Sequence, residues 1–591
     1  MSSKADIKTQ RYIQNIKGLT QFLNKYVYLI IGAIAAWLLL YTQMADWDGF
    51  YYDADGYMRA LRVRHFLQEP SFGEQLVAES NYPFGEVLHW TRPMDILWAL
   101  VALPFYHLGN LSDTVFLSGA FLAPLLGIAT TLVLAQGIRR HFNVYLTLFG
   151  CFIFLSNPVI MEIFSAGRPD HHALMLFLSV YAETLCLCWL KKKNDLYLPF
   201  IGIILSLAVF TVVEGIILYA LVLIYFLYLY IYKNGSLVPP VKISKYFAIA
   251  LTLCLLLNPP YEGFLYPDNG RLSIVYVVAS WLCFSGFYIL SAYKSSHQKI
   301  ISLLAMSVIM LIVMAMIFGK DIFLFPINKE VKLIFHRFIS EYANVMELDI
   351  WTSLCYHGFS TVAVILSIYM LKQQPYRRLM VLNLVLGLPL YALSLLFARF
   401  SSYQAVYIIL PFLCLSDMLY KKSDFSKNKQ AEFPGIIWGV AMAVILLEVL
   451  VTLPDKYMLK KQKAFFSSSL CAAVYQIGGT LLTDIFLSPQ YVWHCHVNTV
   501  GTPYHRNQQG ILDNYAILDF TAEQQMRSLL KKHQVTQILL FNDYSDKIYP
   551  LTPSNERKLY YRLIKHENIP AFLEKVPTKQ QNAHLYKVKT Q

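Results

Sequence analysis

The sequence predicts a mainly α-helical membrane protein that crosses the bilayer many times and ends in a smaller soluble α/β domain. Its 591 residues are 56% hydrophobic and 15% charged, whereas soluble domains average about 25% charged residues. Apolar runs of spanning length recur from residue 26 to residue 453. Short Lys and Arg clusters separate them on one side only, which is the pattern of cytoplasmic loops.

About thirteen runs are predicted to span the membrane, because a spanning helix needs roughly 20 apolar residues. They lie at about 26–41, 115–136, 144–161, 173–190, 198–213, 215–232, 246–257, 272–292, 300–318, 351–371, 379–397, 403–419 and 436–453. A shorter apolar segment at 96–106 is expected at the membrane interface. Basic residues before the first run predict a cytoplasmic N-terminus. The long loops 46–92 and 320–349 then face the outer side.

The chain divides into a transmembrane region, 1–453, and a tail, 454–591, that is expected on the outer side. In the tail, 522–533 is predicted to be a helix, and 536–541 and 583–588 are predicted to be strands. Cys471 and Cys495 lie in this tail, and their spacing leaves open whether they pair. The net charge of +13 does not indicate nucleic-acid binding, because the basic residues sit between apolar runs and no nucleic-acid motif is present.

Acidic residues crowd the start of the first outer loop. Asp46, Asp48, Asp53 and Asp55 stand within ten residues, and their mutual repulsion would be relieved by a divalent cation such as Mg²⁺ or Mn²⁺. The alternative is a solvated acidic loop in which an Asp caps a helix.

A second polar cluster, Asp170-His171-His172, directly precedes an apolar run on the same side. Asp and His are both metal ligands. The alternative is that Asp170 caps the following helix.

Two further residues belong to the outer side. Glu341 lies in the second long loop, where an ordinary polar loop residue is the alternative reading. Arg399 stands at the outer end of the eleventh run. It either reaches the interface with its charged end or binds a phosphate bidentately. Glu214, between two closely spaced runs, is interpreted as a loop residue.

The order and sidedness of these motifs resemble the STT3-type catalytic subunits of oligosaccharyltransferases, which have the membrane glycosyltransferase fold called GT-C. Asp53 and Arg59 keep the spacing of that family's first acidic motif. Segment 167–172 is similar to its second acidic motif, and 339–341 to its Ser-Val-Ser-Glu motif. Arg399 is similar to its Arg near the outer end of the eleventh span.

The resemblance implies a function for each matching residue. Asp53, Asp170, His172 and Glu341 are expected to bind the divalent metal, Mn²⁺ or Mg²⁺, with Asp53 and Glu341 also catalytic. Arg399 is expected to hold the donor phosphate. Further possible site residues are Asp55, Arg59 and His171.

The tail departs from the family. The Trp-Trp-Asp-Tyr-Gly motif that recognises the glycosylation sequon is missing, and the nearest candidate is 499–507. Its His505 and Arg506 belong either to a substrate-binding loop or to a structural turn.

The leading hypothesis is a GT-C glycosyltransferase in a bacterial inner membrane. It would transfer a sugar or oligosaccharide from a polyprenyl phosphate or pyrophosphate to a protein, lipid or polysaccharide acceptor on the outer face. The alternatives are a transporter or flippase of a lipid-linked glycan and a non-catalytic GT-C relative. Against transport, the acidic residues lie in outer loops, whereas transporters bind near the bilayer midplane.

Overall fold

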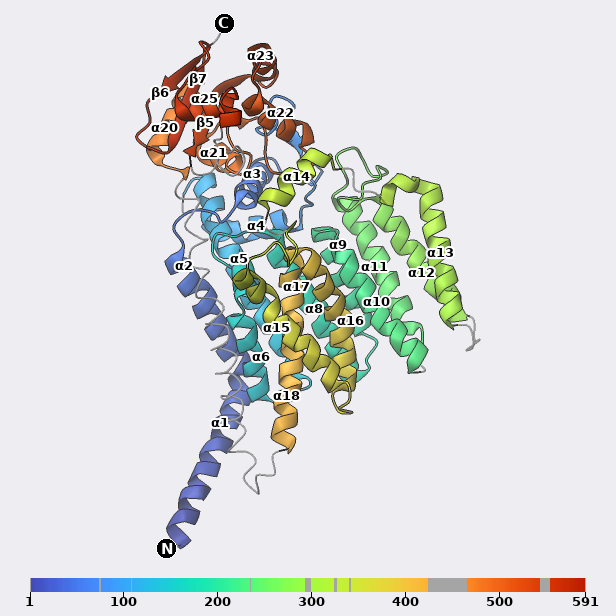
Figure 1. Cartoon of the computed structure of the whole chain (residues 1–591). Coiled ribbons are helices and arrows are strands. Elements are labelled where there is room, and N and C mark those ends of the chain that lie inside the picture. Colours follow the sequence, from blue (N-terminus) through green and yellow to red (C-terminus); the bar gives the residue numbers. More distant parts are fainter. Residues whose placement is uncertain are drawn as a thin grey trace.

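A computed structural model gives the fold. It describes residues 2–73, 76–107, 109–233, 235–292, 299–323, 327–339, 342–422, 465–542 and 553–589. A bundle of long helices fills the lower part of Figure 1, and the C-terminal domain lies over its upper end, opposite the N-terminus.

The helical region follows the apolar runs of the sequence. Its helices are α1 (Ser2–Ala36), η1 (Trp37–Thr42), α2 (Gln43–Asp46), α3 (Ala54–Gln68), α4 (Pro93–Ala102), η2 (Leu103–Phe105), α5 (Leu111–Arg139), α6 (Val144–Ser156), α7 (Pro158–Ile163), α8 (His171–Lys192), α9 (Tyr197–Thr211), α10 (Gly215–Tyr232), α11 (Val238–Leu257), α12 (Ile274–Ala292), α13 (Lys299–Phe318), η3 (Lys320–Phe323), α14 (Lys329–Phe338), α15 (Ile350–Met370), α16 (Arg377–Leu396), η5 (Ala398–Phe400), α17 (Ser401–Ala405), η6 (Val406–Ile408) and α18 (Ile409–Lys422).

Among the described residues, ten helices are long and apolar enough to cross a membrane. They match ten of the predicted spans. The predicted spans at 144–161 and 198–213 form shorter apolar helices, α6 and α9. Asn157 and Pro158 end α6 early, because Asn157 instead caps the separate helix α7. The thirteenth predicted span, 436–453, lies outside the described residues, as does the predicted domain boundary after residue 453.

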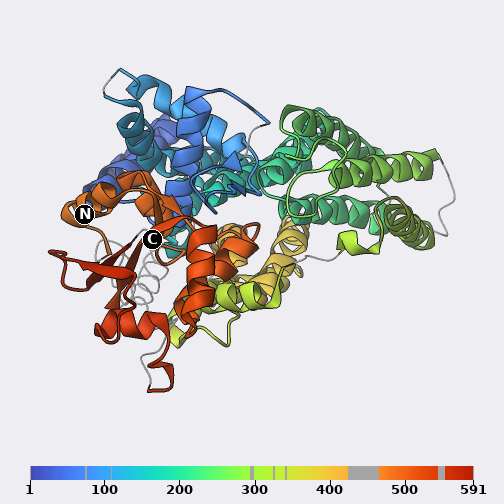
Figure 2. The same ribbon diagram turned by 90° about the horizontal axis from the view of Figure 1, so that it is seen from above.

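The helices of the bundle differ in how much of their surface is buried, as expected if some of them face lipid. The apolar window of α8 is 83% buried, whereas that of α13 is 6% buried. α8 packs between α5 and α9. The α12–α13 hairpin, in green, stands out from the side of the bundle (Figure 1 and Figure 2). An apolar helix that is exposed in this way is stable only against lipid. The chain is therefore a multi-pass membrane protein.

The C-terminal domain is α/β, as the sequence predicts. Its elements are α20 (Ser468–Ile477), β3 (Thr480–Leu482), α21 (Ser488–Cys495), β4 (Asn498–Thr499), α22 (Gln508–Asp519), α23 (Glu523–Lys532), β5 (Val535–Phe541), η9 (Pro553–Asn555), α25 (Leu559–Lys565), β6 (Leu573–Val576) and β7 (Ala583–Val588). The strand order is β4-β3-β5-β7-β6. β3 pairs parallel with β4 and β5, and β7 pairs antiparallel with β5 and β6. A disulfide joins Cys471 to Cys495, which settles the pairing that their spacing left open.

The first outer loop binds the C-terminal domain through buried polar groups. It contains the short strands β1 (Leu76–Val77) and β2 (Glu86–Val87). The Glu86 carboxylate accepts hydrogen bonds from Ser80 and from Thr502 of the C-terminal domain. The backbone of Thr499 pairs with this loop at two points, Glu79 and Tyr82. These bonds hold the C-terminal domain directly over the loop that carries Asp53.

Candidate functional site

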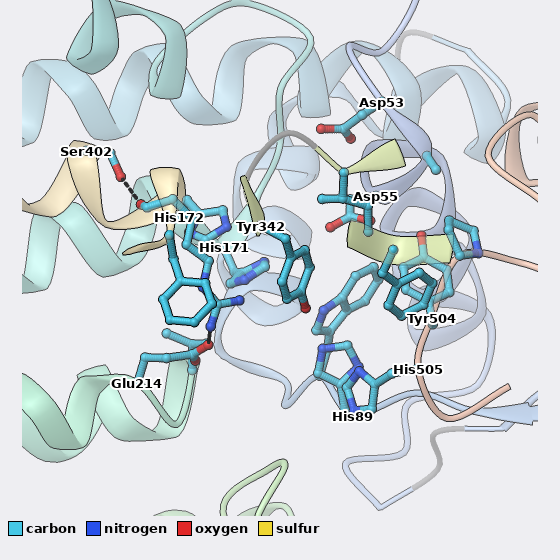
Figure 3. Close-up of a pocket in the computed structure, with 18 of the residues that line it drawn as sticks. Asp53, Asp55, His89, His171, His172, Glu214, Tyr342, Ser402, Tyr504 and His505 are labelled. Carbon is cyan, nitrogen blue, oxygen red and sulfur yellow. Dashed lines mark hydrogen bonds and ion pairs between the residues drawn. The ribbon is translucent and has the colours of Figure 1, made fainter. Parts of the chain in front are cut away.

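A cavity of about 1080 Å³ opens between the outer ends of the helices and the C-terminal domain. Its wall combines residues that are far apart in the chain: Asp53, Asp55, His89, Trp90, Glu162, Arg168, His171, His172, Glu214, Arg271, Tyr342, Arg399, Tyr504 and His505. Figure 3 shows His171, His172 and Glu214 on one side of this space, and Asp55, His89, Tyr504 and His505 on the other. Six of the sequence-predicted site residues line this cavity: Asp53, Asp55, His171, His172, Arg399 and His505. Asp170, Arg59 and Arg506 are not among the lining residues.

A close backbone contact brings the two polar motifs together. Tyr52 donates its backbone N–H to the Gly167 carbonyl at 2.9 Å. Gly167 has a φ of +76°, and a Cβ atom there would lie 2.5 Å from the Trp47 indole nitrogen and 2.9 Å from the Phe50 carbonyl oxygen. Only glycine fits such a position without strain. The glycine of the second motif is therefore the residue that lets it pack against the first.

Asp170 stands at the N-cap of α8, but its side chain makes no capping hydrogen bond. It turns instead toward two imidazoles. Its Oδ1 is 2.5 Å from His171 Nδ1, and its Oδ2 is 3.8 Å from His172 Nε2. One donor atom from each of the three residues lies within 4.8 Å of the others. The Asp170 side chain therefore does not cap α8, although the residue occupies the N-cap position.

Charge keeps Asp170 ionised although it is buried. Burial raises the pKa of its carboxyl group, but His171, His172 and Arg168 outweigh that effect and hold the pKa well below its usual range. Its buried Oδ1 atom lies against His171 Nδ1, at 2.5 Å. A cation between the carboxylate and the imidazoles would be held by both kinds of ligand.

His172 is oriented by a residue that the sequence analysis did not identify. Its Nδ1 lies 2.5 Å from the Tyr403 hydroxyl, which leaves Nε2 facing Asp170. Metal-binding histidines are usually held in this way, with the second ring nitrogen in a hydrogen bond. Tyr403 comes from α17, more than two hundred residues further along the chain, so no local pattern could have indicated the pair.

Arg59 was predicted as a possible site residue, but it does not line the cavity. Its side chain is 1% exposed and pairs with Asp95 at 3.3 Å. It also lies over the Trp90 ring, 4.2 Å from the centroid, and reaches His171 Nδ1 at 3.1 Å. Because guanidinium only donates, His171 Nδ1 accepts this bond. Arg59 therefore contacts His171 from outside the cavity.

Asp53 and Asp55, from the first acidic motif, line the cavity but are not part of the Asp170-His171-His172 cluster. Asp53 caps α3, accepting the Gly56 N–H at 3.1 Å, as the alternative reading expected. It still faces the cavity, as does Asp55 beside the Tyr504 hydroxyl. Burial and then the Asp55 charge raise the pKa of Tyr504 well above its usual value.

Arg399 lines the cavity from η5 and forms an ion pair with Glu214. The predicted location of Arg399 agrees with the structure. Glu214, interpreted as a loop residue, does lie in the turn between α9 and α10, where it is the N-cap of α10, and it also lines the cavity. The only signal in the sequence was a carboxylate between two apolar runs, where an unpaired charge would be costly.

The C-terminal domain completes the wall with Tyr504 and His505. The Tyr504 ring packs edge-on against Trp90 at 4.8 Å between centroids, and the His505 ring lies 4.2 Å from that of His89. Burial and the neighbouring Arg506 lower the pKa of His505 to about 4, so it is neutral at pH 7. Arg506 itself pairs with Asp268 and is not among the lining residues.

Glu341, predicted as a metal ligand and catalytic residue, lies outside the described residues. Its neighbour Tyr342 lines the cavity near Arg399, whose guanidinium is 5.6 Å from the Tyr342 ring centroid. The predicted loop 320–349 therefore reaches the cavity at Tyr342.

Comparison with known proteins supports this architecture. No profile of a known protein family matches the chain. The dolichyl-phosphooligosaccharide-protein glycotransferase 1 of Archaeoglobus fulgidus is 26% identical over 261 residues, which cover 42% of this chain and 42% of that protein. The chain thus matches less than half of the length of this curated relative.

Two solved structures from the same organism share the fold. The oligosaccharyltransferase AglB with an inhibitory peptide and a dolichol-phosphate superimposes with a TM-score of 0.65 at 14% identity, covering 88% of this chain and 70% of that one. The oligosaccharyltransferase in complex with Zn and sulfate gives 0.62 at 13% identity, covering 87% and 68%.

The chain is therefore a multi-pass membrane protein with the GT-C fold. The resemblance to the STT3-type oligosaccharyltransferase subunits, which its motifs indicate, is confirmed at the level of the fold.

Proposed function

We propose that this protein is a metal-assisted glycosyltransferase that takes a sugar or oligosaccharide from a polyprenyl phosphate or pyrophosphate. The observation that carries the proposal is that two kinds of group meet at one cavity. Asp170, His171 and His172 form a cluster suited to a cation. His171 and His172 of this cluster line the cavity together with Arg399, whose guanidinium is suited to a phosphate. A sugar bound to a phosphate needs both when the phosphate departs.

The cluster fits a divalent metal ion. Its donor atoms are close together, and the Asp170 carboxylate is buried beside both imidazoles. Asp170 and His172 are the ligands we propose, because Tyr403 already orients His172 toward the carboxylate. Imidazole donors suit transition metals better than Mg²⁺, which favours Mn²⁺ of the two predicted ions. When bound, the ion would supply positive charge to a leaving phosphate.

Arg399 is the proposed ligand of the donor phosphate. Guanidinium matches phosphate oxygens with two parallel hydrogen bonds. The relatives support this choice of donor, because one structure contains a dolichol-phosphate and another a sulfate. In the proposed reaction, the acceptor atom attacks the anomeric carbon while the bond from that carbon to the phosphate oxygen breaks. The phosphate leaves on its polyprenyl chain.

The acceptor is proposed to enter beside Asp53 and Asp55, with Glu341 as a further carboxylate from the second outer loop. A carboxylate at this point can orient the acceptor and take its proton. Tyr504 and His505 would contact the acceptor from the C-terminal domain. The acceptor is a protein, a lipid or a polysaccharide group.

The outer side of the membrane is the proposed location of the site, with the N-terminus cytoplasmic and a bacterial inner membrane as the setting. The Cys471–Cys495 disulfide supports this orientation, because disulfides persist in oxidising compartments such as the periplasm.

The test uses the full-length protein in proteoliposomes with extracted polyprenyl-linked glycans and Mn²⁺. We expect the wild type to release polyprenyl phosphate or pyrophosphate, and D170A and D53A to release less than about 1% as much. D519N is the matched control, because Asp519 is exposed in the C-terminal domain and pairs only with a surface lysine. Movement of intact donor across the membrane without release would show transport instead, and equal release by D170A would refute the proposed site.

A further inference from the structure

We infer that Glu214 is a counter-ion that the donor phosphate must replace on Arg399, and that it thereby sets how tightly the protein binds phosphorylated lipids. This inference rests on the proposed function, because it concerns the same cavity and the same donor. It assigns a specificity-determining role to a residue that the motifs of the sequence did not mark.

The geometry of the pair carries the inference. The Glu214 Oε1 atom accepts a hydrogen bond from an Arg399 terminal nitrogen. Each side chain is 25% exposed, and both line the cavity. The pair is therefore neither a surface ion pair nor fully enclosed. It stands where a ligand from the cavity can reach it.

Glu214 is only half satisfied in this arrangement. Its second oxygen, Oε2, is buried and accepts no hydrogen bond. A carboxylate that serves only to anchor an arginine would be expected to use both oxygens in a bidentate pair. The single contact makes the ion pair easier to exchange for a phosphate, which offers more oxygens to the same guanidinium.

A second pair in the same cavity provides a natural comparison. Arg168 Nη1 donates to Glu162 Oε1 at 2.9 Å, and the Arg168 guanidinium also lies 4.8 Å from the Tyr52 ring centroid. Arg168 is fixed by partners on two sides and belongs to the loop that positions Asp170. Its carboxylate therefore serves to hold a loop, whereas Glu214 faces the group proposed to bind the donor.

The consequence for binding follows from charge. A phosphate that reaches Arg399 comes close to the Glu214 carboxylate, and like charges at short range repel strongly in a partly buried site. The repulsion grows with ligand charge, so it acts more strongly on a pyrophosphate than on a monophosphate. Glu214 would thus favour a donor with one phosphate and would help the spent phosphate to leave.

The experiment measures binding and needs no turnover. Geranylgeranyl phosphate and geranylgeranyl pyrophosphate are titrated into the purified full-length protein in detergent with Mn²⁺. The variants are E214Q, R399Q, the double variant E214Q/R399Q and the control E162Q. Glutamine keeps the size of the side chain and a hydrogen-bond acceptor for Arg399, so E214Q changes mainly the charge. Thermal unfolding checks that each variant is folded.

We expect E214Q to bind the monophosphate about tenfold more tightly than the wild type does. The increase in affinity should be larger for the pyrophosphate. R399Q should bind both more weakly. The double variant should resemble R399Q, because the gain depends on an arginine that Glu214 no longer neutralises. E162Q should increase the affinity for either lipid clearly less than E214Q does.

The outcomes separate this inference from the proposed function. If R399Q binds as the wild type does, Arg399 is not the phosphate ligand, and both fail. If R399Q is weak but E214Q shows no gain, or gains equally without Arg399, only the counter-ion role is overturned.

Discussion

The Tyr403 hydroxyl lies 2.5 Å from Nδ1 of His172, and this contact fixes which ring nitrogen faces Asp170. We expect Y403F to lower the affinity for Mn²⁺ by about tenfold, because loss of a group that orients a metal-binding histidine commonly costs 10–100-fold. Electron paramagnetic resonance of free Mn²⁺ during a titration measures this directly. Unchanged affinity would mean that His172 is not a ligand.

Asp170 and Asp53 should separate metal binding from turnover. D170N should abolish measurable Mn²⁺ binding, because Asp170 is the carboxylate in the close cluster. D53N should retain Mn²⁺ affinity within a few-fold but lose glycosyl transfer, since Asp53 lines the cavity outside that cluster. The same Mn²⁺ titration, combined with a donor-release assay, makes the comparison. Loss of Mn²⁺ binding in D53N would place Asp53 among the ligands after all.

Glu86 should make stability depend on pH. Burial raises the pKa of its carboxyl group to about 7 despite hydrogen bonds from Ser80 and Thr502. The folded protein therefore holds this proton more tightly than the unfolded chain does. The resulting stabilisation is present near pH 4.5 and is lost as the pH rises to 7, by on the order of 3 kcal/mol.

E86Q should remove this dependence, because glutamine cannot ionise. Thermal unfolding of both proteins in detergent between pH 5 and pH 8 provides the measurement. The variant should be the more stable protein at pH 8, with a smaller difference at pH 5. If the unfolding temperatures of the two proteins changed with pH in the same way, Glu86 would not be the source of the pH dependence.

Asp95 should be a major structural residue. It is fully buried and contacts Arg59, Arg62 and Arg92, at 3.3, 2.8 and 3.2 Å. Its loss leaves three buried guanidinium groups near one another without their shared counter-charge. We expect D95N to destabilise the protein by about 3–5 kcal/mol, seen as a lower Tm. D113N, at the exposed start of α5, is a control of the same chemistry.

The Cys471–Cys495 disulfide closes a loop of 24 residues in the C-terminal domain. Replacing both cysteines by serine should reduce the stability of that domain by about 3 kcal/mol. Proteolysis of the folded protein, with and without reductant, reports the change. Equal resistance under both conditions would show that the bond is not formed in the protein.

Local patterns were sufficient for the fold, and for part of the site. The strand 583–588 was predicted from alternation and forms β7 with those bounds, and apolar runs located the long helices. The motif Asp170-His171-His172 was visible because its ligands are adjacent in the chain. In contrast, Glu214 and Tyr403 gain their roles only from partners brought near by packing. A lone Glu or Tyr beside an apolar run carries no such information.

The placement of Tyr504 and His505 has a consequence for biosynthesis. Asp53, Asp55, His171 and His172 come from the first third of the chain, yet the opposite wall comes from its last sixth. A nascent polypeptide that has already inserted its helices still lacks that wall. The cavity is therefore complete only once the C-terminal domain has folded over the helices.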